Sequence, residues 1–99
     1  MRSRFLSAAE EEFGDAAAFY EGEEFSLGEE FIAGVFATVD LLQRQPMLGK
    51  PAGGRFRSFP VRKFPFNIIY KLDEDEIVVV AVGHQSRKPG YWRDRIFSD

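Results

Sequence analysis

Cysteine is absent from this sequence of 99 residues, and histidine occurs only once. Without thiols the chain has no disulfide framework and no thiolate metal site, and a single histidine argues strongly against a zinc site made by the protein alone. We therefore expect no metal and no cofactor. No apolar run approaches the length of a membrane span, and the N-terminal segment carries acids where a signal peptide needs an apolar core. These absences predict a cytoplasmic protein that has no membrane partner.

Basic residues are scarce in the N-terminal part of the chain. Residues 1–43 hold two arginines against ten acids, whereas residues 44–99 hold eleven lysines and arginines against six acids. A basic half suits an acidic partner or a nucleic acid, although surfaces are also charged for solubility alone. The net charge of −3 argues against strong non-specific binding of nucleic acid.

The length and composition are those of one small folded unit. Ninety-nine residues leave no room for two independent cores, and 44% of them are hydrophobic, including eleven phenylalanines. We therefore expect a single domain that spans residues 1–99.

Two helices are predicted in the acidic half. Ser7 and Ser26 are each followed three residues later by a glutamate, Glu10 and Glu29, which is the spacing of a capping box. Apolar residues recur behind both at helical intervals. The first stripe comprises Phe13, Ala16, Ala17 and Tyr20, and the second comprises Phe31, Ile32, Val35, Phe36, Val39 and Leu42. The second helix must end before Pro46, so the two helices form an antiparallel hairpin.

The basic half has the pattern of strands. Residues 55–59, 64–72 and 77–82 are predicted to form an antiparallel meander, and residues 2–6 a weak edge strand. Residues 47–54 hold one proline and three glycines and are predicted to be loop. The fold class is therefore α+β, with an N-terminal helical hairpin packed on a small antiparallel sheet in the order β-α-α-β-β-β. The hairpin covers one face of the sheet, and the other face is left to solvent or a partner.

Cations and aromatic residues gather near one end of the predicted sheet. The candidate residues are Arg57, Arg62, Lys63, His84, Arg87, Lys88, Tyr91, Trp92, Arg93 and Arg95. Such a set suits contacts with phosphates together with base stacking, and its histidine and tyrosine suit general acid–base work on a phosphodiester. The alternative is structural: the histidine as a hydrogen-bonding group, the aromatic residues as packing that fixes the tail, and the arginines as solvated charge.

The order of motifs along the chain resembles the ParE/RelE superfamily of toxins from type II toxin–antitoxin modules. The segments that carry the likeness are RFLSAAEEEF, LLQRQPMLGKP, FPFNIIYKL with the acidic hairpin after it, and VGHQSRKPGYW. The likeness extends over essentially the whole chain, and the β-α-α-β-β-β order that it implies is the one predicted from periodicity. The HQSRKPGYW ending and the acidic net charge place the chain nearer the ParE branch, that of plasmid-stabilisation factors.

The resemblance to ParE implies a toxin that blocks growth by binding a protein target, DNA gyrase, without catalysis. It also implies a cognate antitoxin partner that neutralises the toxin in a hetero-oligomer. A RelE-like protein would instead be a metal-independent endoribonuclease that cuts mRNA on the ribosome. In that alternative the catalytic residues would be Arg62, Lys63, His84, Arg87 and Tyr91, although Gln85 stands where an arginine is common. The remaining candidates, Arg57, Lys88, Trp92, Arg93 and Arg95, would bind the target or RNA. A third possibility is an orphan member without toxicity.

Overall fold

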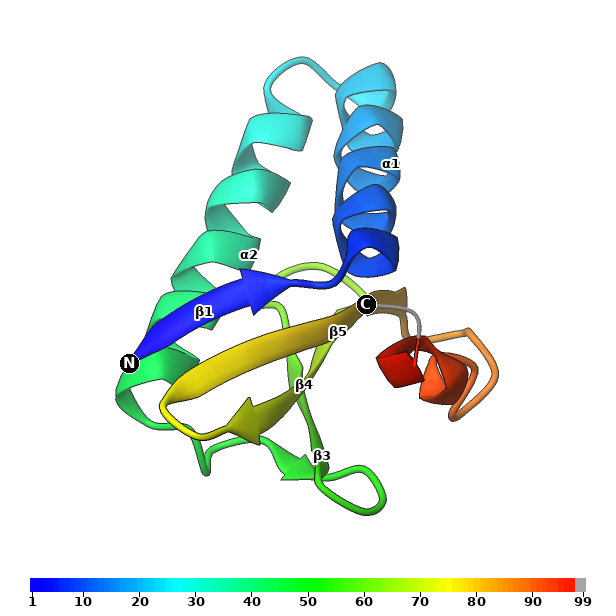
Figure 1. Ribbon diagram of the computed structural model, residues 1–99. Helices are drawn as coiled ribbons and strands as arrows, with labels where there is room; N and C mark the ends of the chain where they lie inside the picture. The colour runs from blue at the N-terminus through cyan, green and yellow to red at the C-terminus, as the bar shows by residue number, and fades with distance from the viewer. Residues whose placement is uncertain (98–99) are drawn as a thin grey trace.

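Two helices precede most of a five-stranded sheet in the computed structural model, which describes residues 1–97 (Figure 1). The elements in chain order are β1 (Arg2–Phe5), α1 (Ser7–Glu23), α2 (Leu27–Arg44), β2 (Lys50–Pro51), β3 (Phe56–Pro60), β4 (Phe66–Asp73), β5 (Glu76–His84) and a short 3₁₀ helix (Arg93–Phe97). The predicted α+β class and helical hairpin are confirmed. Over these residues no helix combines the length and apolar character that crossing a membrane requires.

The sheet is mixed, with its strands in the order β1-β5-β4-β3-β2. β1 pairs with β5 in parallel, from Arg2 beside Glu76 to Phe5 beside Val79, and the other pairs are antiparallel. The predicted loop over 47–54 is wrong in part, because it contains β2. This strand has only two residues, one of them Pro51, and no alternation marks it. Its pairing with β3 defines it, so the local sequence carries no signal.

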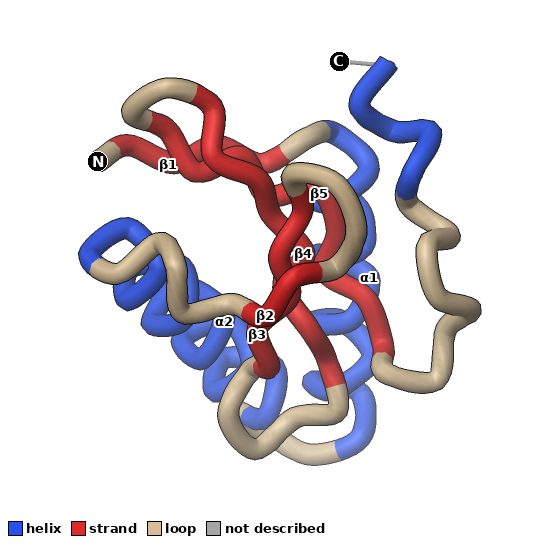
Figure 2. Tube along the Cα trace, turned by 90° about the horizontal axis from the view of Figure 1, so that it is seen from below, coloured by secondary structure: helices blue, strands red, loops and turns tan. Residues whose placement is uncertain are grey.

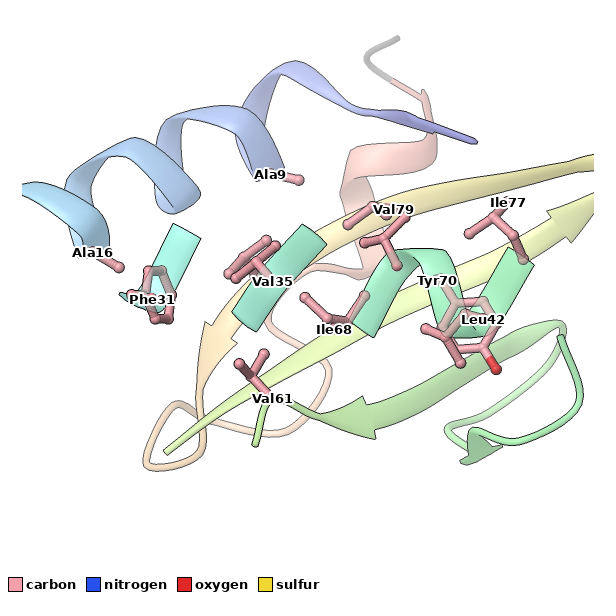
Figure 3. Close-up of a cluster of buried hydrophobic side chains, with 12 residues drawn as sticks. Ala9, Ala16, Phe31, Val35, Leu42, Val61, Ile68, Tyr70, Ile77 and Val79 are labelled. Atoms are coloured by element: carbon pink, nitrogen blue, oxygen red, sulfur yellow. The ribbon is translucent and has the colours of Figure 1, made fainter. Parts of the chain in front are cut away.

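The helical hairpin covers one face of the sheet, and the main core lies between them. Phe31, Val35 and Leu42 project from α2 toward the sheet, and all three are fully buried (Figure 3). They meet side chains of β4 and β5, namely Ile68, Tyr70, Ile77 and Val79. Burying one such side chain stabilises the fold by about 1.5–3 kcal/mol. The packing of this stripe therefore holds α2 against the sheet.

The opposite face of the sheet is covered over β5, so the prediction that this face is left to solvent or a partner is wrong in part. Val78, Val80 and Ala81 of β5 point there and form a second cluster with Trp92, which is 4% exposed. The Trp92 ring lies edge-on to that of Phe56 at 4.7 Å. A strand that is apolar on both faces needs cover on both, and the segment after β5 supplies it. Figures 1 and 2 show this segment turning back beside the sheet.

Both predicted capping boxes are wrong. The N-cap position of α1 is occupied by Leu6, so Ser7 already lies within the helix. Ser26 does precede α2, but its φ of 69° is left-handed and its side chain makes no capping bond. The carboxylate of Glu21 accepts from the backbone N–H of Ser26 at 3.1 Å and from that of Gly28 at 2.9 Å. The end of α1 therefore caps the start of α2 and fixes the hairpin turn.

Candidate functional site

The segment after β5 forms one wall of a cavity of about 300 Å³, which we call the tail cavity. Its other walls come from β2 and from the adjoining ends of β4 and β5. The functional side chains that line it are Lys50, His84, Arg87, Lys88, Tyr91, Trp92 and Arg93. Six of these seven were predicted as candidates, and β5 and the tail place them together because the chain reverses direction after His84.

A single carboxylate, that of Glu12 on α1, holds the tail behind this cavity. The Tyr91 hydroxyl donates to Glu12 Oε2 at 2.6 Å. The Arg95 guanidinium donates to both carboxylate oxygens, at 2.7 and 2.9 Å. The backbone N–H of Val82 adds a bond of 3.0 Å. Glu12 therefore joins the first helix, the inner strand β5 and the tail.

The electrostatics of this cluster keep the two side chains bonded to Glu12, those of Tyr91 and Arg95, protonated. Burial raises the pKa of Tyr91 far above its usual range, and the hydrogen bond to Glu12 and its negative charge raise it further. The hydrogen bond to Glu12 also raises the pKa of Arg95. Tyr91 is thus a neutral hydrogen-bond donor throughout the physiological range, which makes it a poor general base.

Glycine at position 83 permits this arrangement. A Cβ built there would lie 2.5 Å from the Tyr91 hydroxyl oxygen. No real contact is so short, so a side chain at position 83 would displace the Tyr91 hydroxyl, which is bonded to Glu12. Gly83, the middle residue of Val-Gly-His at the end of β5, is therefore required by the close approach of the Tyr91 hydroxyl.

His84 is exposed at the rim of the tail cavity. The backbone N–H of Ser86 donates to His84 Nδ1 at 3.0 Å, and the ring edge packs on Phe66 with centroids 5.2 Å apart. Because a backbone N–H can only donate, Nδ1 accepts, and the neutral ring carries its proton on Nε2. The ring therefore carries its donor, Nε2–H, at the rim of the cavity and has a structural role through Nδ1 and its contact with Phe66.

The remaining predicted candidates lie apart from the tail cavity. Arg62 and Lys63 line a separate groove along α2. Arg57 donates to the backbone oxygen of Gly49 at 2.7 Å and so fixes the loop before β2. Arg95 is engaged by Glu12 behind the cavity. The set named for an endoribonuclease is consequently divided between two surfaces.

Sequence reasoning missed two residues of the site, Glu12 and Lys50. Glu12 stands in a run of three glutamates, which is typical of solvated helix charge. A signal was present in the helical spacing, because Glu12 follows Ala9 by three residues and precedes Ala16 by four. Residues so spaced share one face of a helix, and both alanines are buried. Lys50 had no signal, because the strand that places it could not be predicted.

The fold is shared with a solved structure described as the chromosomal ParDE TA system from P. aeruginosa. The TM-score is 0.62 at 14% sequence identity, and the alignment covers 85% of this chain and 95% of that one. Comparison with curated protein sequences gives no significant match.

The chain belongs to the ParE toxin family. The model of this family, described as the ParE toxin of the type II toxin–antitoxin system parDE, matches residues 4–89. The match includes both helices and all of β2 to β5, and it stops just before Tyr91, Trp92 and Arg95. Family membership confirms the ParE side of the resemblance seen in the sequence.

Proposed function

We propose that this ParE-family toxin blocks growth by binding DNA gyrase, that it catalyses no reaction itself, and that a cognate antitoxin neutralises it. Family membership supports the toxin–antitoxin part of the proposal. The geometry of the predicted catalytic residues supports the non-catalytic part.

The observation that carries the proposal is the division of those residues between two surfaces. Cleaving a phosphodiester requires the acid, the base and the cations to reach one phosphate at hydrogen-bond distance. Here Arg62 and Lys63 line the groove along α2, whereas His84 and Arg87 line the tail cavity. The Tyr91 hydroxyl is already engaged in its hydrogen bond to Glu12. This arrangement favours a binding protein over a ribonuclease.

The groove along α2 suits the antitoxin. Its volume is about 690 Å³, and its floor is apolar, from Ala33, Gly34, Ala37, Phe59 and Phe64. Arg62 and Lys63 add positive charge to the lining, which also holds one acid, Glu30. An amphipathic helix with acids beside its apolar face fits such a groove, because the small residues of α2 allow close approach and the cations steer the partner.

The target is tested with purified, antitoxin-free protein in two assays. We expect loss of DNA supercoiling by purified gyrase and no new mRNA 5′ ends on translating ribosomes. Intact supercoiling would refute the gyrase proposal. New 5′ ends would establish the endoribonuclease instead, and the absence of growth arrest on induction would identify an orphan member.

The antitoxin surface is tested by co-purification with the product of the neighbouring reading frame. Ala37→Glu places a carboxylate in the groove, and we expect it to abolish co-purification. Ala18→Glu is the matched control, because Ala18 is an exposed alanine of α1 outside the groove. Equal binding by both variants would place the antitoxin elsewhere.

A further inference from the structure

Among the residues that the structure describes, the tail cavity is lined by cations and by no acid, although the chain has 16 acidic residues against 13 lysines and arginines. Its cations are Lys50, Arg87, Lys88 and Arg93, with His84 at the rim. A concave wall of one charge over a low-dielectric core concentrates the electric field and attracts counter-charge. In a protein of acidic net charge, such a wall calls for an explanation beyond solubility.

Most of this charge is not neutralised by the residues that the structure describes. Lys50 and Lys88 are exposed and form no ion pair within residues 1–97. Arg87 approaches Glu12 only to 4.0 Å, and that carboxylate is already bonded to Arg95 and Tyr91. These three cations retain N–H donors for a ligand.

Arg93 is held in place before any ligand arrives. Its guanidinium lies over the Trp92 ring, 4.9 Å from the centroid, and donates to the backbone oxygen of Ala52 at 3.1 Å. Gly90 has a φ of +77°, and a Cβ at that position would lie 2.7 Å from Arg93 Nε. A side chain fixed in this way loses little conformational entropy on binding.

The aromatic residues of the cavity offer no open platform for a nucleobase. The Tyr91 ring is approached by the guanidinium carbons of Arg87 at 3.9 Å and Arg95 at 5.0 Å. Trp92 is buried against Phe56. A ligand is therefore recognised by its charge and not by stacking. A volume of about 300 Å³ is at the small end of ligand sites and suits a compact anion.

We propose that the tail cavity binds the polyphosphate group of a small molecule, a di- or triphosphate, through Lys50, Lys88 and the guanidinium groups of Arg87 and Arg93. Phosphate oxygens accept several N–H bonds each, and arginine matches them in bidentate geometry. This site is separate from the groove along α2, so it adds a ligand to the proposed function and does not depend on the gyrase target.

The ligand class is tested by titration calorimetry of the purified protein with pyrophosphate, ATP and adenosine. We expect pyrophosphate and ATP to bind with similar affinity, and adenosine not to bind. The affinity should fall as salt is raised, because the contacts are ionic. Absence of pyrophosphate and ATP binding at millimolar concentration would overturn the proposal, and so would binding of single-stranded DNA alone, which would make the cavity a nucleic-acid surface.

Three alanine variants locate the binding. We expect Lys50→Ala and Lys88→Ala each to raise the Kd for pyrophosphate about three- to tenfold, as the loss of one close ionic contact would. Arg2→Ala removes the same charge at the opposite edge of the sheet and should leave the Kd unchanged. Equal weakening by all three would show a general charge effect and refute the site. Thermal melting of each variant verifies that it is folded.

Discussion

Arg95 and Glu12, separated by 83 positions in the sequence, form a two-point ion pair with N–O distances of 2.7 and 2.9 Å. Their side chains are only 20% and 16% exposed, respectively. The pair ties the tail to the first helix across β5, and the Tyr91 hydroxyl shares the same carboxylate. Because the tail forms a wall of the tail cavity and covers one face of the sheet, this one acid supports both the fold and the candidate site.

Replacing Glu12 by glutamine should destabilise the protein. Glutamine keeps the shape but leaves the Arg95 charge without a counter-charge in a largely buried place. Removing one partner of a buried ion pair costs about 3–5 kcal/mol, and residual hydration of Arg95 reduces this to about 2 kcal/mol. Urea denaturation followed by circular dichroism measures the change in the free energy of unfolding.

Glu11→Gln is the matched control for this prediction. Glu11 is the exposed neighbour on the same helix, and its replacement should change stability by less than about 0.5 kcal/mol. If the two variants unfold at the same urea concentration, the Glu12 cluster contributes nothing to stability.

Stability should fall in alkaline solution because of the tyrosines. Burial raises the pKa of Tyr20, Tyr70 and Tyr91 above the usual value of 10.0, and Glu12 raises that of Tyr91 further. Unfolded tyrosines lose protons near pH 10, whereas the folded ones hold them, so the folded state binds more protons there. The stabilisation is fully present below about pH 10 and is lost as the pH rises through the folded pKa values.

Two measurements test the alkaline prediction. Ultraviolet absorbance of the folded protein should show little tyrosinate near pH 10. Unfolding the protein with urea at that pH should increase the tyrosinate absorbance. Urea midpoints should be constant around neutral pH and decrease above about pH 10. A normal tyrosinate titration in the folded protein would contradict the burial of these hydroxyls.

The hairpin turn predicts a specific order of effects at two residues. Glu21→Ala removes the carboxylate that accepts from Ser26 and Gly28, and should cost about 1 kcal/mol, as the loss of a helix cap does. Ser26→Ala should change stability by less than about 0.5 kcal/mol, because this side chain does not cap the helix. Thermal denaturation of both variants measures the two effects. A larger loss of stability for Ser26→Ala than for Glu21→Ala would support the capping box at Ser26 instead.

The elements that the sequence predicted well are those with a strong period. The stripe from Phe31 to Leu42 marked α2, and the alternating or continuous apolar runs marked β3, β4 and β5. The failures lie where a distant partner decides the local structure. β2 exists only because β3 pairs with it, and α2 is capped by Glu21 because α1 returns beside it.

The candidate site was predicted in part for the same reason. The residues from His84 to Arg93 are close in sequence, so the tail brings them together whatever its detailed path. Arg62 and Lys63 depended on how the loop between β3 and β4 is oriented, and that loop turns toward α2. Glu12 needed the tail to pack against α1, a contact that no local pattern records.

Tyr91→Phe separates the two proposed modes of toxicity. The change removes only a hydroxyl that is bonded to Glu12, so it should lower the free energy of unfolding by about 1 kcal/mol. Under the proposed binding mode, induced expression in a bacterial host should still arrest growth, because this hydroxyl takes part in no reaction. Colony counts after induction, normalised to the amount of folded toxin, provide the measurement. A loss of toxicity of more than about tenfold at equal protein level corresponds to more than about 1.4 kcal/mol in a transition state, and it would contradict a mode of action in which this hydroxyl takes no part.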